Sequence, residues 1–187
     1  MPTASLAVFC GASPGSRPEY AAAAHSLAAV LVERDVRLVY GAGSVGIMGI
    51  LADEVLRLGG EVLGVIPQFL LDREVGHTGL TELLVTESMH ERKLLMARHA
   101  DGFLALPGGI GTLEELIEVF TWTQLGLHQK HCGLLNTTGY YDHLLNLLAH
   151  MAEEGFLRAG AVADLRVSAD AEAVVRALLA SRRPPSL

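Results

Sequence analysis

The stretch GFLALPGGIGTLEELIEVF, residues 102–120, indicates both the fold and the place where its chemistry is to be sought. It opens with a short apolar run, 102–106, typical of a buried strand that ends at Pro107. Three glycines in four residues follow, and glycine at that density weakens helices and strands alike. A helix is expected over 112–125. A strand, a glycine-rich turn and a helix in this order predict a site where backbone groups bind a ligand.

The same alternation of short apolar runs and amphipathic runs extends along the chain. Strands are expected at 6–10, 37–40, 61–66, 83–86, 102–106, 132–135 and 165–167. Helices are expected at 19–33, 47–58, 89–99, 112–125, 140–154 and 169–181, and an irregular loop at 68–79. Strands that are apolar throughout and separated by helices predict a parallel sheet covered on both faces. The fold class is therefore α/β, a Rossmann-like doubly wound sheet.

The length of 187 residues suits a single domain, and neither an internal repeat nor a linker interrupts it. We expect one nucleotide-binding domain over residues 1–181. A flexible tail over 182–187, which contains two prolines, is expected to follow.

Composition excludes several classes of partner. The net charge of −7 without a basic stripe argues against nucleic acid. The longest apolar helical stretch, 20–32, is Ala-rich and interrupted by His25, which is too weak for a membrane span. No secretory signal precedes the first strand, and Cys10 and Cys132 lie in apolar runs as expected for inert buried thiols, so a cytoplasmic location is expected. No Cys/His set has zinc spacing, so no metal is expected, and His128 and His131 are interpreted as helix capping residues.

Three glycine-rich turns, 11–15, 41–46 and 108–111, fall at the carboxyl ends of expected strands, where ligands bind in such sheets. PGGIGT before a helix is typical of an anion-binding site, although no P-loop lysine follows it. GAGSVG at 41–46 fits the dinucleotide fingerprint, but the expected acidic residue is missing because Glu61 begins the next strand. Two interpretations of 41–46 stay open: a dinucleotide site, or a border to a nucleotide's sugar or phosphate.

Thr112 and Glu115 have the spacing of a capping box, with Thr112 as N-cap. The alternative for Glu115 is a carboxylate that faces a cationic centre, because a glutamate beside a phosphate is unfavourable. Glu114 and Glu118 are expected to be solvated.

Ser88 and Glu91 fit a second capping box at the start of the helix 89–99. Arg92 and Lys93 then fall in its first turn, where the helix dipole disfavours cations. A bound anion nearby would explain this placement, and a solvated basic face is the alternative.

MHERKLLMA (89–97) and PGGIGTLEE (107–115) resemble the two signatures of the LONELY GUY (LOG) family. That family comprises cytokinin riboside 5′-monophosphate phosphoribohydrolases, long mislabelled lysine decarboxylases. The resemblance extends from FCGASPG (9–15) to EEGF (153–156), which is nearly the whole chain.

The resemblance implies hydrolysis of the N-glycosidic bond of AMP or an N6-substituted AMP, without a cofactor, in a homodimer with its site near the interface. It implies catalysis by Arg92 and Glu115, with the carboxylate stabilising oxocarbenium character on the ribose and orienting or deprotonating water. Arg92 would hold phosphate or ribose and help to keep Glu115 ionised. The substrate-binding residues would be Arg92, Glu115, Glu74, Lys93, Gly108, Gly109, Ile110, Gly111, Thr112, Leu113, Glu114, Thr121, Gly11, Ser13, Gly43 and Met89.

Two residues depart from the family's usual pattern. Ala42 stands in a YGGG motif, where its methyl group would narrow the turn, and His131 stands where proline is usual. The catalytic signatures are intact. The alternatives to cytokinin activation are an AMP nucleosidase of nucleotide salvage and a module that binds an AMP-like nucleotide without turnover. The apolar stretch 116–125 is compatible with a dimer interface or with core.

Overall fold

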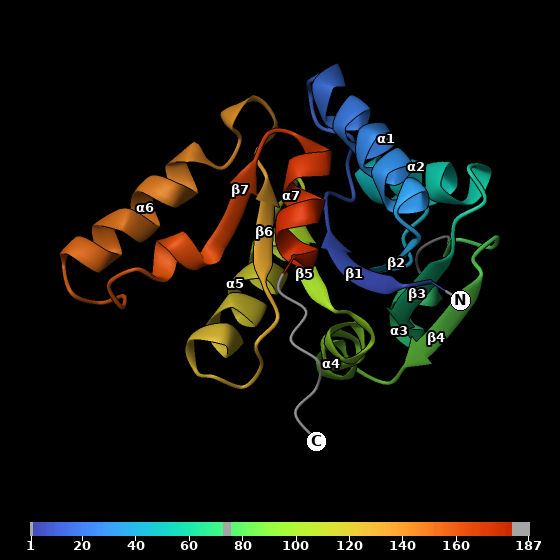
Figure 1. Ribbon diagram of the computed structural model, residues 1–187. Coiled ribbons are helices and arrows are strands. Elements are labelled where there is room, and N and C mark those ends of the chain that lie inside the picture. The colour runs from blue at the N-terminus through green and yellow to red at the C-terminus, as the bar shows by residue number, and fades with distance from the viewer. Residues whose placement is uncertain (1, 73–75, 181–187) are drawn as a thin grey trace.

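The computed structural model describes residues 2–72 and 76–180 of the chain. The seven strands of these residues form one sheet in the order β4-β3-β2-β1-β5-β6-β7, with every neighbouring pair parallel (Figure 1). The strands are β1 (Ala4–Phe9), β2 (Val36–Tyr40), β3 (Val62–Pro67), β4 (Glu82–Thr86), β5 (Gly102–Ala105), β6 (Cys132–Leu135) and β7 (Leu165–Ser168). The predicted parallel α/β sheet is confirmed.

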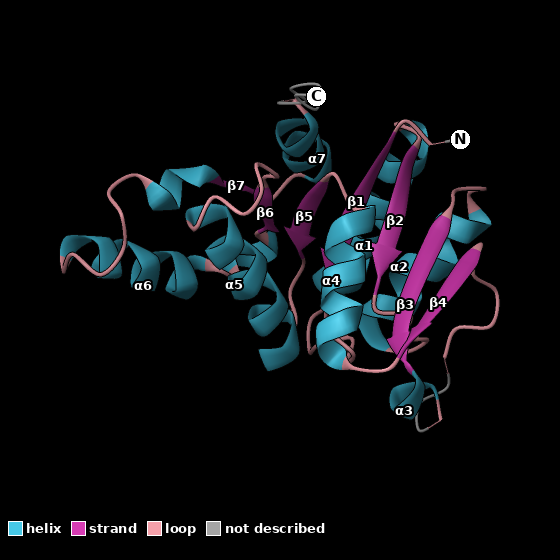
Figure 2. Ribbon diagram, turned by 90° about the horizontal axis from the view of Figure 1, so that it is seen from below, coloured by secondary structure: helices cyan, strands magenta, loops and turns pink. Residues whose placement is uncertain are grey.

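Helices cover both faces of this sheet (Figure 2). The α-helices are α1 (Pro18–Glu33), α2 (Gly46–Arg57), α3 (Gln68–Leu71), α4 (Met89–His99), α5 (Ile110–Gln124), α6 (Asp142–Glu153) and α7 (Ala171–Leu179). Two 3₁₀ turns of the described chain, η1 (Thr137–Gly139) and η2 (Ala161–Asp164), connect α6 to β6 before it and to β7 after it. Helices α1, α2 and α7 pack on one face, and α4, α5 and α6 on the other.

The strands contribute side chains to two hydrophobic cores, because successive side chains of a strand point to opposite faces of the sheet. In β1, Leu6 and Val8 pack beneath α1 and α2, whereas Ala7 and Phe9 pack against the α4 and α5 side. Burial of each large aliphatic side chain contributes about 1.5–3 kcal/mol. The uninterrupted apolar character of the strands is thus explained by burial on both sides.

The strand order reverses between β1 and β5, which are neighbours although four crossovers separate them along the chain. The loops that leave their carboxyl ends run in opposite directions and open a crevice, the usual ligand site of doubly wound sheets. The Gly11 amide donates to the Pro107 carbonyl (3.2 Å), which ties the two loops together at the base of the crevice. Two of the three glycine-rich turns therefore border the reversal point.

Several element boundaries differ from the sequence-based expectation. The segment expected to be an irregular loop contains the short helix α3, and Gly76 forms a bridge with Gly43. The helix expected from residue 140 begins at Asp142, because Thr138 has φ 55° and a 3₁₀ turn precedes it. α7 begins at Ala171, since the Asp170 side chain accepts from the Ala173 amide (2.7 Å) and caps it. The expected tail, 182–187, lies outside the described residues.

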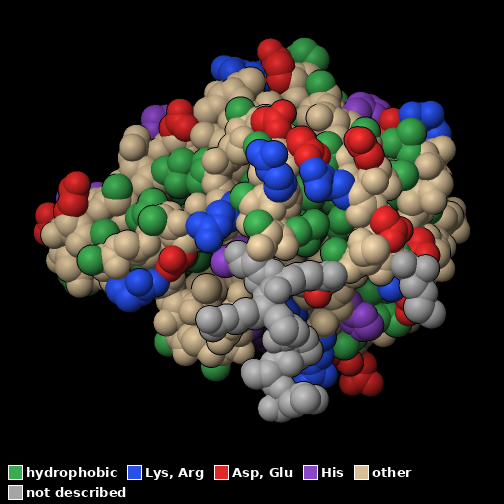
Figure 3. Space-filling model, in the orientation of Figure 1, with side chains coloured by type: hydrophobic (Ala, Val, Ile, Leu, Met, Phe, Trp, Pro, Cys, Tyr) green, Lys and Arg blue, Asp and Glu red, His purple; other side chains and the backbone are tan. Residues whose placement is uncertain are grey.

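The surface gives two further observations. On the face shown in Figure 3, basic and acidic side chains are interspersed. Among the described helices, none combines the length and the hydropathy that a membrane crossing requires.

Candidate active site

Helix α4 is capped as the sequence predicts. The Ser88 hydroxyl accepts from the Glu91 amide (3.2 Å), and the Glu91 carboxylate accepts from the amide of Glu87 (2.8 Å), one residue before the cap. The helix starts here and therefore carries Arg92 and Lys93 within its first turns. Both are buried, with exposed fractions of 8% and 9%. The two cations thus project into the protein and not into solvent.

Arg92 is fixed by backbone oxygens at the ends of two strands. Its Nε donates to the Val65 carbonyl (3.1 Å) and its Nη2 to the Gly41 carbonyl (3.3 Å). Nη1 lies 3.7 Å from the sulfur of Met89. A guanidinium held in this way presents a fixed positive charge beside the crevice.

Helix α5 starts two residues earlier than expected. It begins at Ile110 with Gly109 as N-cap and no side-chain cap, so the prediction of Thr112 as N-cap is wrong. Glycine is an acceptable N-cap, and Thr112 is instead buried inside the first turn, packed on the Cα of Gly108. Glu115 accordingly lies in the second turn.

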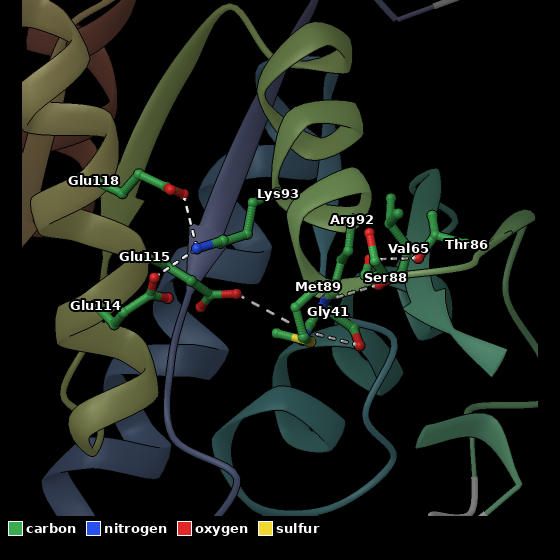
Figure 4. Close-up of polar contacts among 10 residues, drawn as sticks. All are labelled: Gly41, Val65, Thr86, Ser88, Met89, Arg92, Lys93, Glu114, Glu115 and Glu118. Carbon is green, nitrogen blue, oxygen red and sulfur yellow. Dashed lines mark hydrogen bonds and ion pairs between the residues drawn. The ribbon is translucent and has the colours of Figure 1, made fainter. Parts of the chain in front are cut away.

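Glu115 faces Arg92, as the alternative interpretation predicts. Its Oε1 lies 3.8 Å from Arg92 Nη2, and only 13% of its side chain is exposed (Figure 4). Burial raises the pKa of the Glu115 carboxyl above its ordinary value, and the positive charge of Arg92 only partly opposes this. A carboxylate with a raised pKa is better suited to accept a proton from water than a solvated one.

Lys93 joins α4 to α5 through two carboxylates. Its Nζ donates to Glu114 Oε1 (2.5 Å) and lies 3.1 Å from Glu118 Oε2 (Figure 4). Burial would lower the pKa of Lys93, but the hydrogen bonds with these two carboxylates outweigh it and raise the pKa. Glu114 is about half exposed to solvent, as expected, although it also pairs with Lys93, whereas Glu118 is only 27% exposed and departs from the expectation. The negative charge beside Lys93 is supplied by the neighbouring helix.

Arg92 and Glu115 border a cavity of about 260 Å³. Its lining comes from five separate segments of the chain: Cys10, Ala12, Gly41, Met48, Leu70, Met89, Arg92, Gly109, Gly111, Thr112, Glu114 and Glu115. Burial raises the pKa of the Cys10 thiol strongly, and Glu115 adds to the effect, so this cysteine stays protonated and inert. The charged groups of this lining are Arg92, Glu114 and Glu115, and Glu115 faces Arg92.

A second cavity, of about 290 Å³, lies on the other side of the turn before α5. It is lined by Gly11, Ala12, Ser13, Pro14, Gly15, Tyr20, Ile47, Pro107, Gly108, Gly109 and Tyr140. Gly109 borders both cavities. The first hydrogen bond within α5 runs from the Leu113 amide to the Gly109 carbonyl (3.1 Å), so the amides before Leu113 find no acceptor in the helix. These amides can bind an anion.

The turn that carries the dinucleotide fingerprint is closed. The Ile47 and Met48 amides, at the start of α2, both donate to the Gly11 carbonyl (3.0 and 3.2 Å). A protein oxygen therefore occupies the helix end where a pyrophosphate would bind. Of the two interpretations of residues 41–46, the structure favours the second, a border to the site.

The remaining predicted binding residues are spread more widely. Ile110 and Leu113 border an adjacent cavity of about 300 Å³ beyond the turn. Gly43 is buried against Met48, and exposed Thr121 donates its hydroxyl back to the Ile117 carbonyl (2.7 Å). Glu74 lies outside the described residues.

Sequence reasoning missed Tyr20 and Tyr140, which line the second cavity. Neither residue belongs to a glycine-rich turn or to a charged cluster, so no local pattern marked it. Helix capping by His128 stays a prediction: its ring packs against Phe103 (5.2 Å between centroids), and its Nδ1 accepts from the Lys130 amide. Within residues 2–72 and 76–180, no group of His, Cys, Asp and Glu side chains could hold a metal ion.

Comparison with known proteins finds a family model and relatives that agree with one another. The family described as "Possible lysine decarboxylase" matches residues 48–178. A probable cytokinin riboside 5′-monophosphate phosphoribohydrolase, LOG4 of Oryza sativa subsp. japonica, is 52% identical over 86% of this chain and 70% of its own length. The cytokinin riboside 5′-monophosphate phosphoribohydrolase of Rhodococcoides fascians is 47% identical over 93% and 88%.

Solved structures share the fold. The X-ray structure of TM1055 covers 96% of this chain and 100% of its own, with a TM-score of 0.73 at 21% identity. The molybdenum cofactor carrier protein of Chlamydomonas reinhardtii covers 95% and 99%, with a TM-score of 0.71 at 19% identity. At these identities the likeness shows the fold alone.

Proposed function

The chain belongs to the LOG family of cytokinin riboside 5′-monophosphate phosphoribohydrolases, and from this premise we propose that it hydrolyses the N-glycosidic bond of an N6-substituted adenosine 5′-monophosphate. The products are the free base and ribose 5-phosphate. One observation carries the proposal: the buried carboxylate of Glu115 lies 3.8 Å from the fixed guanidinium of Arg92, and both line a cavity that is also lined by Gly109 and Gly111 of the turn before and at the start of α5.

The reaction places positive charge on the ribose as the bond from C1′ to N9 breaks. Glu115 stabilises that charge and accepts a proton from the attacking water, whose oxygen bonds to C1′. The electron pair of the broken bond leaves with the base, which takes up a proton from solvent, and Glu115 then releases its proton to solvent. The amides of Gly109, Gly111 and Thr112 bind the 5′-phosphate, and their positive helix end offsets its charge.

Arg92, which lies beside Glu115 and Met89 in the cavity lining, orients the ribose. Its two carbonyl partners hold the guanidinium in place before the substrate arrives, so little reorganisation is needed. Lys93, with Glu114 and Glu118, holds α4 against α5 and so sets the separation of Arg92 and Glu115. Direct substrate contacts by Lys93, Glu74 and Thr121 stay predictions.

The test is a chromatographic assay of base release from AMP and, separately, from N6-isopentenyl-AMP. We expect release from both, with the higher kcat/KM for the isopentenyl nucleotide. Release mainly from AMP would replace cytokinin activation by an AMP nucleosidase of salvage. No release from either, while both nucleotides raise the Tm, would contradict hydrolysis and support a binding module.

We further propose that the protein is a homodimer. Leu116, Val119 and Phe120 of α5 are buried in the core of this chain and so give no support to an interface. The support lies on the outer face of α5, where Ile110, 82% exposed, borders an open groove with Leu113, Glu114, Ile117 and Glu118. Sedimentation should give twice the chain mass of 19.9 kDa, and Ile117→Arg should halve it. Leu58→Arg, which changes an exposed leucine after α2, is the control and should stay dimeric. A monomeric wild type would refute this.

A cytoplasmic location is proposed on the state of the thiols. Cys10 and Cys132 are both buried and free, and burial raises the pKa of Cys132 to about 11. Unpaired thiols persist in reducing compartments. Fractionation of the source cells tests this, and recovery outside the cytoplasmic fraction would contradict it.

A further inference from the structure

Three successive carbonyls in the turn before α5 are each held by a donor from another part of the chain. The Tyr141 hydroxyl donates to the Leu106 carbonyl (2.6 Å), and the Gly11 amide donates to the Pro107 carbonyl (3.2 Å). The Tyr140 hydroxyl donates to the Gly108 carbonyl (2.5 Å). The two tyrosines are adjacent in sequence and hold carbonyls two residues apart.

Holding a carbonyl also orients the amide that shares its peptide plane. In a trans peptide the C=O and the following N–H point in opposite directions, and the described chain has no cis peptide bonds. The Gly108 carbonyl shares its plane with the Gly109 N–H. Tyr140 therefore fixes the direction of that N–H. The Leu106 carbonyl shares its plane with the nitrogen of Pro107, which carries no hydrogen, so Tyr141 orients no donor.

The peptide between Gly108 and Gly109 needs such a restraint. Two glycines in succession leave it free to rotate. Thr112 and Gly11 pack against Gly108, but Gly109 is exposed and a Cβ built on it would meet no atom within 4 Å, so packing holds only one end of this peptide. In the described structure, the Gly108 carbonyl accepts its hydrogen bond from the Tyr140 hydroxyl.

Tyr140 is itself well placed to act as a restraint. Its ring meets Tyr20 edge to face at 5.7 Å between centroids and Tyr141 at 5.0 Å. It also borders the cavity formed by the 11–15 turn and Gly109. The Gly109 N–H points away from the Tyr140 hydroxyl, and Gly109 borders the cavity of Arg92 and Glu115 as well. The restraint and a phosphate bound by this N–H would thus lie on opposite sides of the peptide.

We propose that Tyr140 is a positioning residue for the substrate's 5′-phosphate, acting by turning the Gly109 N–H toward it. The inference rests on the proposed function, because that function supplies the phosphate. It concerns binding and not bond cleavage, since the hydroxyl is directed at a carbonyl and not at the ribose.

Tyr140→Phe tests this, with Tyr141→Phe as the matched control. Tyr140→Phe should raise the KM for AMP and the Kd of ribose 5-phosphate about tenfold and leave kcat within about twofold. Adenosine, which lacks the phosphate, should bind both proteins equally. Tyr141→Phe should lower the Tm, because a buried carbonyl loses its donor, and leave the Kd of ribose 5-phosphate unchanged.

The outcomes separate the two proposals. A wild type that binds AMP and releases base, together with a Tyr140→Phe variant of unchanged affinity for ribose 5-phosphate, would overturn the role of Tyr140 alone. Equal losses in both variants, or an equal loss for adenosine, would assign Tyr140 a merely structural role. A wild type that neither binds nor cleaves AMP would defeat the proposed function first.

Discussion

In the turn before α2, a Cβ on Gly41 would overlap the Arg92 guanidinium, and the Gly11 carbonyl accepts the first amides of the helix. At the start of α5, a Cβ on Gly109, the N-cap, or on Gly111, in the first helical turn, would meet no atom within 4 Å. Both turns are rich in glycine and lead into a helix, yet the bare backbone at Gly41 and Gly108 serves protein packing, whereas at Gly109 and Gly111 it faces open space. Glycine content therefore does not distinguish a turn that binds a ligand from a turn that packs against the protein. The atoms that lie opposite each glycine make that distinction.

The largest effect should come from the carboxylate behind the open turn. Glu115→Gln should lower kcat about 10³-fold, as expected for loss of a general base, measured by base release. Glu118→Gln, the same change three residues along α5, should leave kcat within about threefold, because Glu114 still pairs with Lys93. Comparable losses in the two variants would remove Glu115 from the chemistry.

The same carboxyl predicts how rate and stability depend on pH. Burial raises the Glu115 pKa above its ordinary 4.5. The folded protein therefore binds more protons than the unfolded chain between these two pKa values, so this group's contribution to stability is present below the ordinary pKa and falls as pH rises through the raised one. At pH 7 Glu115→Gln should unfold at or above the wild-type Tm, measured by calorimetry. The wild-type kcat/KM should decline on the acid side at a pH above 4.5. A variant that is much less stable at pH 7 would mean that the ion pair with Arg92 outweighs the burial.

In the closed turn, Gly41→Ala should cost about 10²-fold in kcat with the fold retained. The new methyl group would displace the Arg92 guanidinium, and a misplacement of this size is expected to cost about that much. Circular dichroism checks the fold and the base-release assay the rate. Unchanged turnover would show that Arg92 has no fixed position during catalysis.

In the open turn, Gly111→Ala should have a different outcome. The Cβ meets no protein atom and alanine favours the helix, so stability should rise by about 0.5–1 kcal/mol. The methyl group would obstruct the phosphate, and the KM for AMP should rise about tenfold, as loss of one hydrogen bond to a charged group implies. A lower Tm or an unchanged KM would break the distinction between the two turns.

The smallest effect should come from Ala42, the departure from the family pattern. Its backbone is left-handed, with φ 60°, and its methyl group is fully buried beside Gly64. Ala42→Gly should relieve about 1–2 kcal/mol of backbone strain in the folded state. The greater entropy of the unfolded chain with glycine costs about 0.5–1 kcal/mol of stability, and loss of the buried methyl group costs about 0.8 kcal/mol. The free energy of unfolding should change by less than about 1 kcal/mol and kcat should be unchanged. A marked gain in activity would show that Ala42 narrows the site.

The sequence by itself determined the parallel α/β sheet, nearly every helix and strand, and the two segments that carry Arg92 and Glu115. Apolar periodicity and glycine spacing are local properties, so they can be interpreted without knowing the neighbours. The capping of α4 by Ser88 is of the same kind, and it was predicted correctly.

Only the tertiary structure decided which side chains and backbone groups lie opposite one another. The Lys93 pair with Glu114 and Glu118, the Gly11 carbonyl at the start of α2, and the Tyr140 bond to the Gly108 carbonyl each join segments that are distant in sequence. The N-cap of α5 also escaped prediction, because Thr112 is drawn into the helix by its packing on Gly108. These pairings depend on the order of strands, and strand order is set by the burial of both faces of the sheet, which no local pattern contains.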